Sequence, residues 1–182
     1  MRALSLTPPW HIAILSHGKR IENRDWRGCS FRGPILLHAS KGVGTQDDFD
    51  ETVESILGIV NPPPGVGPGS HHDVAHEMAE MRIGGRGRHH AEGWWAPSPT
   101  LARGAIVGRC RVIGVVTSEA DFDRYVGSYY AAPRQRRWWF GGFALLLADV
   151  ERIAEPIPAK GALGFWDFPD AMLADSKWER VP

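Results

Sequence analysis

The residues best suited to chemistry are concentrated in one short stretch near the start of the chain, Ser-His-Gly-Lys-Arg-Ile-Glu-Asn-Arg-Asp-Trp at positions 16–26. Gly18 is typical of the left-handed residue that ends a helix, so Lys19 is expected at a helix end. In the strand that the next residues predict, Glu22 and Arg24 share one face. A carboxylate beside two cations either forms a surface ion-pair cluster, which contributes little to stability, or lines the floor of a polar site.

The overall composition disfavours some partners and not others. With 182 residues, 43% of them hydrophobic, the chain is long enough for one domain with its own core. Its 21 basic and 21 acidic residues cancel, so a general duplex-binding surface is not expected, whereas local basic patches are compatible with this balance. Cys29 and Cys110 lack metal-type spacing and are too few for a disulfide framework. No signal peptide or long apolar run is evident, so we expect a soluble, cytoplasmic protein with no membrane partner.

The order of the elements predicts an α+β fold with a small mixed or antiparallel barrel. Apolar or alternating runs predict strands at 2–6, 20–24, 34–39, 103–116 and 143–150. A short helix is expected over residues 10–16, with Thr7 as its N-cap and Pro8 at its first position. Residues 121–130 show no clear period, and residues 156–166 predict a turn-rich return to a final short strand.

The stretch at about 43–99 differs from the rest and predicts a mostly helical, Gly/Pro-rich insertion in a single domain, 1–182. Thr45 and Asp48 are spaced as a capping pair before apolar residues at helical intervals, which predicts a helix that ends at the Pro/Gly run 61–69. A second helix is expected from Ser70 to about residue 81.

Three possible metal ligands, His72, His76 and Glu80, lie on one face of that second helix. The pattern lacks the second histidine of the metalloprotease motif. A solvated helix face is therefore favoured over a metal site, and no cofactor is expected.

Aromatic and basic residues are adjacent near position 138. Arg134, Arg136 and Arg137 directly precede the pair Trp138-Trp139, and a second pair, Trp94-Trp95, lies in the insertion. Aromatic faces beside basic groups are suited to stacking a base and holding its phosphates. Taken alone, the tryptophan pairs favour the simpler interpretation, in which they pack loops onto the barrel.

Five motifs, in this order and spacing, resemble the ASCH domain family. They are Leu-Ser-Leu-Thr-Pro-Pro-Trp at 4–10, Gly-Lys-Arg-Ile-Glu-Asn-Arg-Asp-Trp at 18–26, Arg-Gly-Pro-Ile-Leu-Leu-His-Ala-Ser-Lys at 32–41, Gly-Ala-Ile-Val-Gly at 104–108, and Pro-Ile-Pro-Ala-Lys-Gly at 156–161 with Gly-Phe at 164–165. The resemblance covers nearly the whole chain outside the insertion. It implies a PUA-like small mixed β-barrel with flanking short helices, and a module that binds RNA or modified bases.

The resemblance also implies a cleft beside the first helix. Its walls would come from the segment that begins at Lys19, together with Glu22, Asn23 and Arg24. Its rim would be completed by Ser5, Trp10, His38, Lys41 and Lys160.

Some ASCH proteins that this chain resembles are enzymes. One subgroup deacetylates N4-acetylcytidine with a lysine, a threonine three residues later and a glutamate from a later strand. Lys19 matches the lysine, but Glu22 stands where that threonine would be, which speaks against this reaction. A ribonuclease activity is also attributed to the family, and Lys19 with Glu22 could provide acid–base chemistry, with His38 as a third candidate group.

Three hypotheses follow. In the first, a base of RNA, of another single strand or of a modified nucleoside stacks on Trp10 or Trp139 and offers its polar edge to the residues around Lys19. Its phosphates would be held by Arg134, Arg136 and Arg137. The second hypothesis is a hydrolase of RNA or a modified nucleoside. The third is a scaffold whose helical insertion binds a protein.

Overall fold

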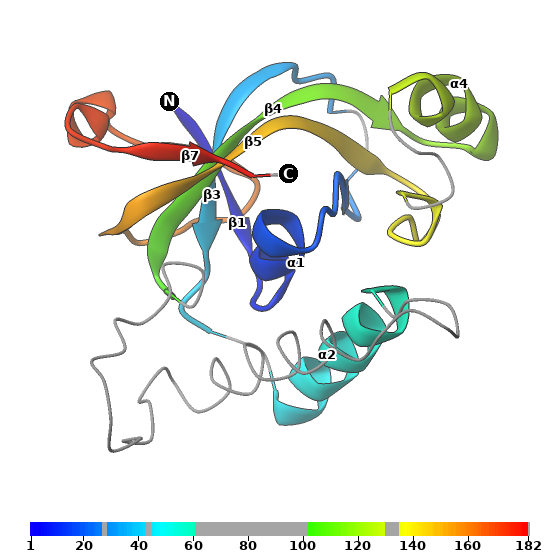
Figure 1. Cartoon of the computed structure of the whole chain (residues 1–182), viewed down its shortest axis with the longest axis horizontal. Helices are drawn as coiled ribbons and strands as arrows, with labels where there is room; N and C mark the ends of the chain where they lie inside the picture. Colours follow the sequence, from blue (N-terminus) through cyan, green and yellow to red (C-terminus); the bar gives the residue numbers. More distant parts are fainter. Residues whose placement is uncertain (27–28, 43–44, 61–101, 130–134, 182) are drawn as a thin grey trace.

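The computed structural model describes residues 1–26, 29–42, 45–60, 102–129 and 135–181 (Figure 1). In chain order the elements are β1 (Arg2–Leu6), α1 (Trp10–Ser16), β2 (Ile21–Asn23), β3 (Gly33–Ala39), α2 (Gln46–Val60), β4 (Ala105–Val116), α4 (Glu119–Tyr129), β5 (Ala144–Pro158), β6 (Phe165–Asp167), the 3-10 helix η2 (Asp170–Leu173) and β7 (Trp178–Arg180). Within these ranges, no helix has the length and apolar character needed to cross a membrane.

The strands form one mixed sheet with the order β2-β5-β4-β3-β1-β6, and β7 pairs with β5. β1 and β3 run parallel, whereas the remaining pairs are antiparallel. The register shifts at three places between β4 and β5, and such irregularities bend strands. The sheet accordingly curls over α1 as a half-barrel (Figure 1). The expected α+β class with a small mixed barrel is confirmed, with the sheet forming a half-barrel.

The apolar core has two layers, because alternate residues of each strand face opposite sides of the sheet. Leu145 and Leu147 of β5 lie inside the curl, together with Ile14 and Leu15 of α1. Leu146, between them in sequence, faces the other side. That second layer contains Ile21, Leu146, Phe122, Trp138 and Trp139.

The stretch 121–130, which shows no clear period in the sequence, lies largely in α4, formed by Glu119–Tyr129. Its start has side-chain capping bonds at a spacing of three to four residues. Asp121 accepts the backbone N–H of Thr117 at 3.1 Å, and the Asp121 amide donates to Ser118 Oγ at 3.2 Å. Such bonds satisfy amides that have no partner in the first turn of a helix. A local capping pattern therefore marks the start of the helix, although the apolar periodicity of the helix is weak.

Two further boundaries differ from the prediction. Residues 156–158, expected in a turn, are the end of β5, where Ile157 pairs with Ile106 and Pro158 with Ala105. Pro158 is tolerated because it is the last residue of the strand. The N-cap of α1 is Pro9 rather than Thr7, and no side chain caps this helix.

Helix α2 occupies the start of the expected insertion, and its predicted cap is present. Thr45 Oγ1 and the Thr45 amide both donate to Asp48 Oδ2, and the Asp48 amide donates back to Thr45 Oγ1. Phe49 and Ile56 of α2 are buried, Phe49 against Ile12 of α1. The expected second helix with His72, His76 and Glu80, the Gly/Arg/His loop and Trp94-Trp95 lie outside the described residues.

Candidate functional site

Lys19 is a buried lysine, placed by the turn that ends α1. Gly18 adopts a left-handed φ of 68°, and the Lys19 amide donates to the Ala13 carbonyl at 3.0 Å. The chain thus folds back against the helix, and only 1% of Lys19 is exposed. The predicted helix stop at Gly18 is confirmed, since a residue without a Cβ adopts this conformation at little cost.

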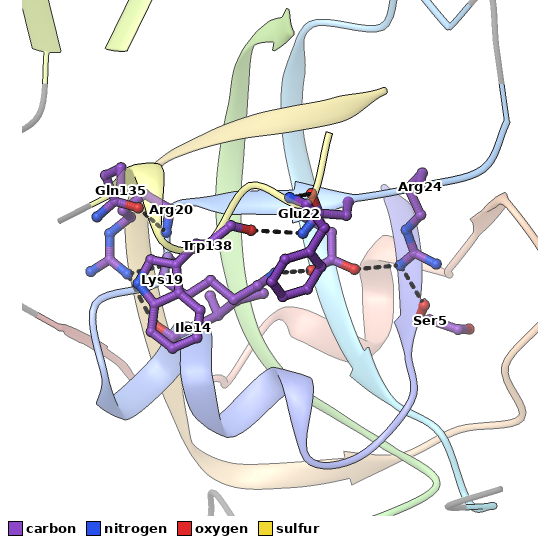
Figure 2. Close-up of polar contacts among 10 residues, drawn as sticks. Ser5, Ile14, Lys19, Arg20, Glu22, Arg24, Gln135 and Trp138 are labelled. Atoms are coloured by element: carbon purple, nitrogen blue, oxygen red, sulfur yellow. Dashed lines mark hydrogen bonds and ion pairs between the residues drawn. The ribbon is translucent and has the colours of Figure 1, made fainter. Parts of the chain in front are cut away.

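A glutamine from a distant segment holds this turn in place. Gln135 Oε1 accepts the Arg20 amide at 3.0 Å, and Gln135 Nε2 donates to the Gly18 carbonyl at 2.9 Å (Figure 2). The buried Arg20 side chain adds bonds from Nη1 to the Ile14 and Lys19 carbonyls. The backbone on both sides of Lys19 is therefore anchored by side chains. Gln135 was not among the predicted site residues, because nothing local in its sequence links it to Gly18.

The Glu22 carboxylate lies between two cations. Glu22 is opposite Leu145 in the β2–β5 pair, so its side chain points into the curl of the sheet. Lys19 Nζ donates to Glu22 Oε2, and Arg24 Nη2 lies 3.2 Å from Glu22 Oε1 (Figure 2). Both Lys19 and Glu22 are buried. The cluster is therefore not an exposed ion-pair group on the surface.

Arg24 connects the ion pair to β1. Its Nη2 atom donates to the Ser5 carbonyl at 2.8 Å, and its guanidinium carbon lies 5.7 Å from the centroid of the Trp26 ring. Arg24 Nε is buried and has no hydrogen-bond partner in the described part of the chain. A buried donor without a partner costs about 1–3 kcal/mol, so an acceptor from a ligand would be favourable there.

Burial lowers the pKa of Lys19 below its usual value, because the ammonium has lost its hydration. The negative charge and hydrogen bond of Glu22 oppose this effect, whereas the positive charge of Arg24 adds to it. The lysine therefore releases its proton more readily than a surface lysine. A lysine in proton transfer needs this property.

A pair of neighbouring aromatic rings lies on the Lys19 side of this cluster. The Trp10 ring, at the first residue of α1, is centred 5.2 Å from Lys19 Nζ. Phe140 lies 5.7 Å from Trp10, ring centroid to ring centroid, with the planes tilted by 59°. Phe140 is 57% exposed, which is unusual for a phenylalanine. It was not predicted as a site residue, although an aromatic followed by Gly141-Gly142 was a visible signal.

Asn23 positions the segment that carries Phe140. Asn23 Nδ2 donates to the Trp138 carbonyl at 2.8 Å, and Asn23 Oδ1 accepts the Phe140 amide at 3.1 Å. Both the nitrogen and the oxygen of the Asn23 side-chain amide thus form hydrogen bonds within the protein. Asn23, predicted to contact a ligand, instead fixes the backbone on either side of Trp139.

Trp139 is buried and packs in the core, so it does not present a face to a base as expected. Its ring stacks on Phe122 with centroids 5.2 Å apart, and its Nε1 donates to the Gly142 carbonyl at 3.1 Å. Arg136 lies 4.8 Å from the same ring and forms an ion pair with Glu119. Arg137 is exposed, and Arg134 lies outside the described residues.

His38 and Ser5 form a separate polar network. His38 Nε2 lies 3.1 Å from the Ala159 carbonyl, which can only accept, so Nε2 carries a proton. Ser5 Oγ lies within 3.2 Å of His38 Nδ1, the Ala162 carbonyl and Trp166 Nε1. Burial lowers the pKa of His38. None of these bonds involves Lys19 or Glu22, so the geometry gives His38 a structural environment.

The two predicted rim lysines are exposed near that network. The Lys41 side chain lies against Gly104, and the Gly104 carbonyl accepts the Ala159 amide at 2.9 Å. Lys160 follows directly, so both lysines lie at the same end of the sheet. The predicted residues therefore separate into a buried cluster around Glu22 and a rim near His38, bridged by Ser5.

Comparisons with known proteins give a structural resemblance. No protein-family model matches the chain, and no curated protein sequence matches it. The chain is similar to the crystal structure of ASCH from Zymomonas mobilis, with 12% sequence identity, 97% of this chain and 95% of that chain covered, and a TM-score of 0.46. A mutant form of that protein gives 11% identity, coverage of 97% and 96%, and a TM-score of 0.44. These neighbours are ASCH proteins, the family that the sequence motifs resemble.

Proposed function

We propose that the chain is a nucleic-acid-binding module that takes one base of RNA, or of a modified nucleotide, beside Trp10 and Phe140. The observation that carries this proposal is the contact of a buried charged cluster with the half-buried Trp10 ring, which in turn lies beside the exposed Phe140 ring. A base matches both features, because its flat face can stack on an aromatic ring and its polar edge can hydrogen-bond to the charged groups.

The polar edge would be recognised by Lys19, Glu22 and Arg24. Lys19 has three N–H groups and uses one on Glu22, the Glu22 carboxylate keeps acceptor positions beyond its two cations, and Arg24 Nε is without a partner in the described residues. The cluster therefore combines donors with an acceptor. A base that left these buried groups unpaired would be rejected strongly, which gives selectivity between bases.

The face of the base would stack on Phe140 or Trp10. Base stacking on an aromatic side chain contributes about 1–3 kcal/mol by alanine substitution. Phe140 is the better variant to test, because its exposure means that its removal leaves no core cavity.

The test measures binding of labelled single-stranded RNA, and of a panel of modified nucleosides as competitors, by fluorescence anisotropy. We expect Phe140→Ala to weaken binding by about 1–3 kcal/mol, whereas Phe140→Trp should keep the affinity of the wild type because it keeps an aromatic ring. Met172→Ala is the matched control, since Met172 is also an exposed apolar side chain but belongs to η2. Equal affinities for wild type and Phe140→Ala would contradict the proposal.

A second candidate function, hydrolysis of RNA or a modified nucleoside, is favoured by one observation. Burial lowers the pKa of Lys19, and Glu22 is hydrogen-bonded to it, so the two groups form a proton-transfer pair. In this reaction Lys19 would exchange a proton with the substrate, and Glu22 would stabilise the charged form of Lys19. Incubation with labelled RNA tests it: product formed by wild type and lost in Lys19→Gln supports an enzyme, and retention without product supports a binding module.

A further inference from the structure

A hollow of about 800 Å³ lies where β3 begins and where β4 and β5 bend. Its most informative lining residues are Arg20, Arg32, Arg111, Tyr125, Leu146 and Asp149. Lys19, Glu22 and Arg24 do not line it, so it differs from the site already described. Its volume is within the range of about 300–1,000 Å³ typical of small-molecule sites.

The lining is electropositive, with three arginines and a single carboxylate. Arg111 donates to Asp149 Oδ2 from Nε at 2.8 Å and from Nη2 at 2.6 Å. Arg32 is exposed, donates from Nη1 to the Phe31 carbonyl at 2.8 Å, and has no ion pair within the described ranges. The Asp149 carboxylate is thus shared by two guanidinium groups, because Arg180 also lies 3.8 Å from it. The positive charge in excess favours an anionic ligand.

The backbone at Asp149 is unusual and holds Arg111 against the hollow. Arg109 pairs with Glu151 and Arg111 with Ala148, so Asp149 and Val150 together oppose one residue of β4 as a β-bulge. Asp149 has a φ of 51°, a left-handed conformation that is uncommon for residues with a Cβ. Strained residues and bulges are concentrated at functional sites, where they re-aim a side chain.

We propose that this hollow binds the sugar–phosphate backbone of single-stranded nucleic acid. The inference rests on the proposed function, because the strand would be the one whose base lies beside Trp10 and Phe140. The two sites are close along the chain: Arg20, the residue before β2, lines the hollow, and Glu22 of β2, about 7 Å further along an extended chain, belongs to the base site.

The chemistry of the lining matches a nucleotide strand better than an acidic peptide. Guanidinium groups bind phosphate oxygens bidentately, and phosphates repeat at every nucleotide. Tyr125 is 41% exposed and the Arg124 guanidinium carbon lies 5.7 Å from its ring centroid, so the ring offers one face to a neighbouring base. An acidic peptide would use the arginines but would leave the ring without a planar partner.

The test compares two labelled ligands, a nucleoside and a single-stranded RNA dodecanucleotide, on the full chain at several salt concentrations. The nucleoside has no phosphate, so it can use the base site alone. We expect Arg32→Gln to weaken binding of the dodecanucleotide about tenfold at low salt and to reduce the salt slope by about 0.7, with no effect on the nucleoside. Lys177→Gln is the matched control, since this exposed lysine lies between η2 and β7, across the sheet from α4 (Figure 1).

The outcomes separate the two proposals. If Phe140→Ala weakens binding of the dodecanucleotide and Arg32→Gln changes neither affinity nor salt slope, the assignment of the hollow is wrong and the base site stands. If only Arg32→Gln has an effect, the hollow stands and the base site fails. If wild type binds neither ligand, both fail. Competition by a poly-glutamate peptide as effective as that by RNA would assign the hollow to an acidic protein and overturn the proposal.

Discussion

Arg24 Nη2 lies 3.2 Å from Glu22 Oε1, on the carboxylate oxygen that Lys19 does not use. One buried carboxylate therefore interacts with two cations, one on either side of it in the sequence. The arrangement is asymmetric, because removing the carboxylate would leave two positive charges together, whereas removing Lys19 would leave an intact pair. This asymmetry decides how the cluster responds to substitution.

The first prediction concerns the stability of this cluster. Glu22→Gln should lower the free energy of unfolding by about 3–5 kcal/mol, because it leaves buried charges uncompensated. Lys19→Met should cost much less, since it removes a buried charge and keeps an apolar chain of similar length. Urea unfolding of both variants measures the difference. Equal losses would show that Arg24 does not depend on Glu22.

The second prediction is a pH dependence of stability that comes from His38. Its pKa in the folded protein lies below the usual 6.5, because burial disfavours the charged ring. Below pH 6.5 the unfolded chain therefore takes up a proton before the folded protein does. Stability should fall as the pH drops from 6.5 through the lowered pKa, since the unfolded state then binds more protons.

Urea unfolding of wild type and His38→Gln between about pH 8 and about pH 5 checks this prediction. Glutamine keeps an N–H donor but does not titrate in this range. The difference in unfolding free energy between the two proteins should change across the window. A difference that stays constant across this pH range would contradict the prediction.

The third prediction concerns the close approach of Gly161 to the His38 network. A Cβ at this position would lie 2.4 Å from His38 Cε1 and 2.6 Å from Ser5 Oγ. Gly161→Ala should destabilise the protein by about 1–3 kcal/mol, as overpacking does. Gly58→Ala is the control: it lies in α2 with nothing near its Cβ, so it should stabilise by up to about 1 kcal/mol. Thermal unfolding of both variants measures whether each substitution lowers or raises the stability of the protein.

The fourth prediction assigns a positioning role to Asn23. Asn23→Ala should weaken RNA binding because it releases the Trp138 carbonyl and the Phe140 amide. Asn23→Asp should have an intermediate effect, since it keeps the acceptor for Phe140 but loses the donor to Trp138. Anisotropy titrations measure the affinities. In the Phe140→Ala background the Asn23→Ala change should have little further effect, and a full additive loss would show a direct contact with RNA instead.

Much of the fold was predictable because its signals are local. The strands β1 and β3, the helix α1 and the cap of α2 depend on alternation, spacing and residues a few positions apart. Helix α4 was missed because its apolar spacing is weak, although Thr117, Ser118 and Asp121 form a capping pattern. The length of β5 was also missed, since its last residues are strand only because β4 pairs with them.

By itself, the sequence determined that Lys19, Glu22 and Arg24 lie close together, because three to five residues around a helix stop and a strand allow little else. Only the tertiary structure decided that Lys19 and Glu22 are buried and that Phe140, not Trp139, is exposed beside them. Those outcomes depend on β5, and on bonds to Gln135 and Trp138, 115 residues away along the chain. No local pattern encodes which distant segment covers a given side chain, so burial and exposure follow from packing alone.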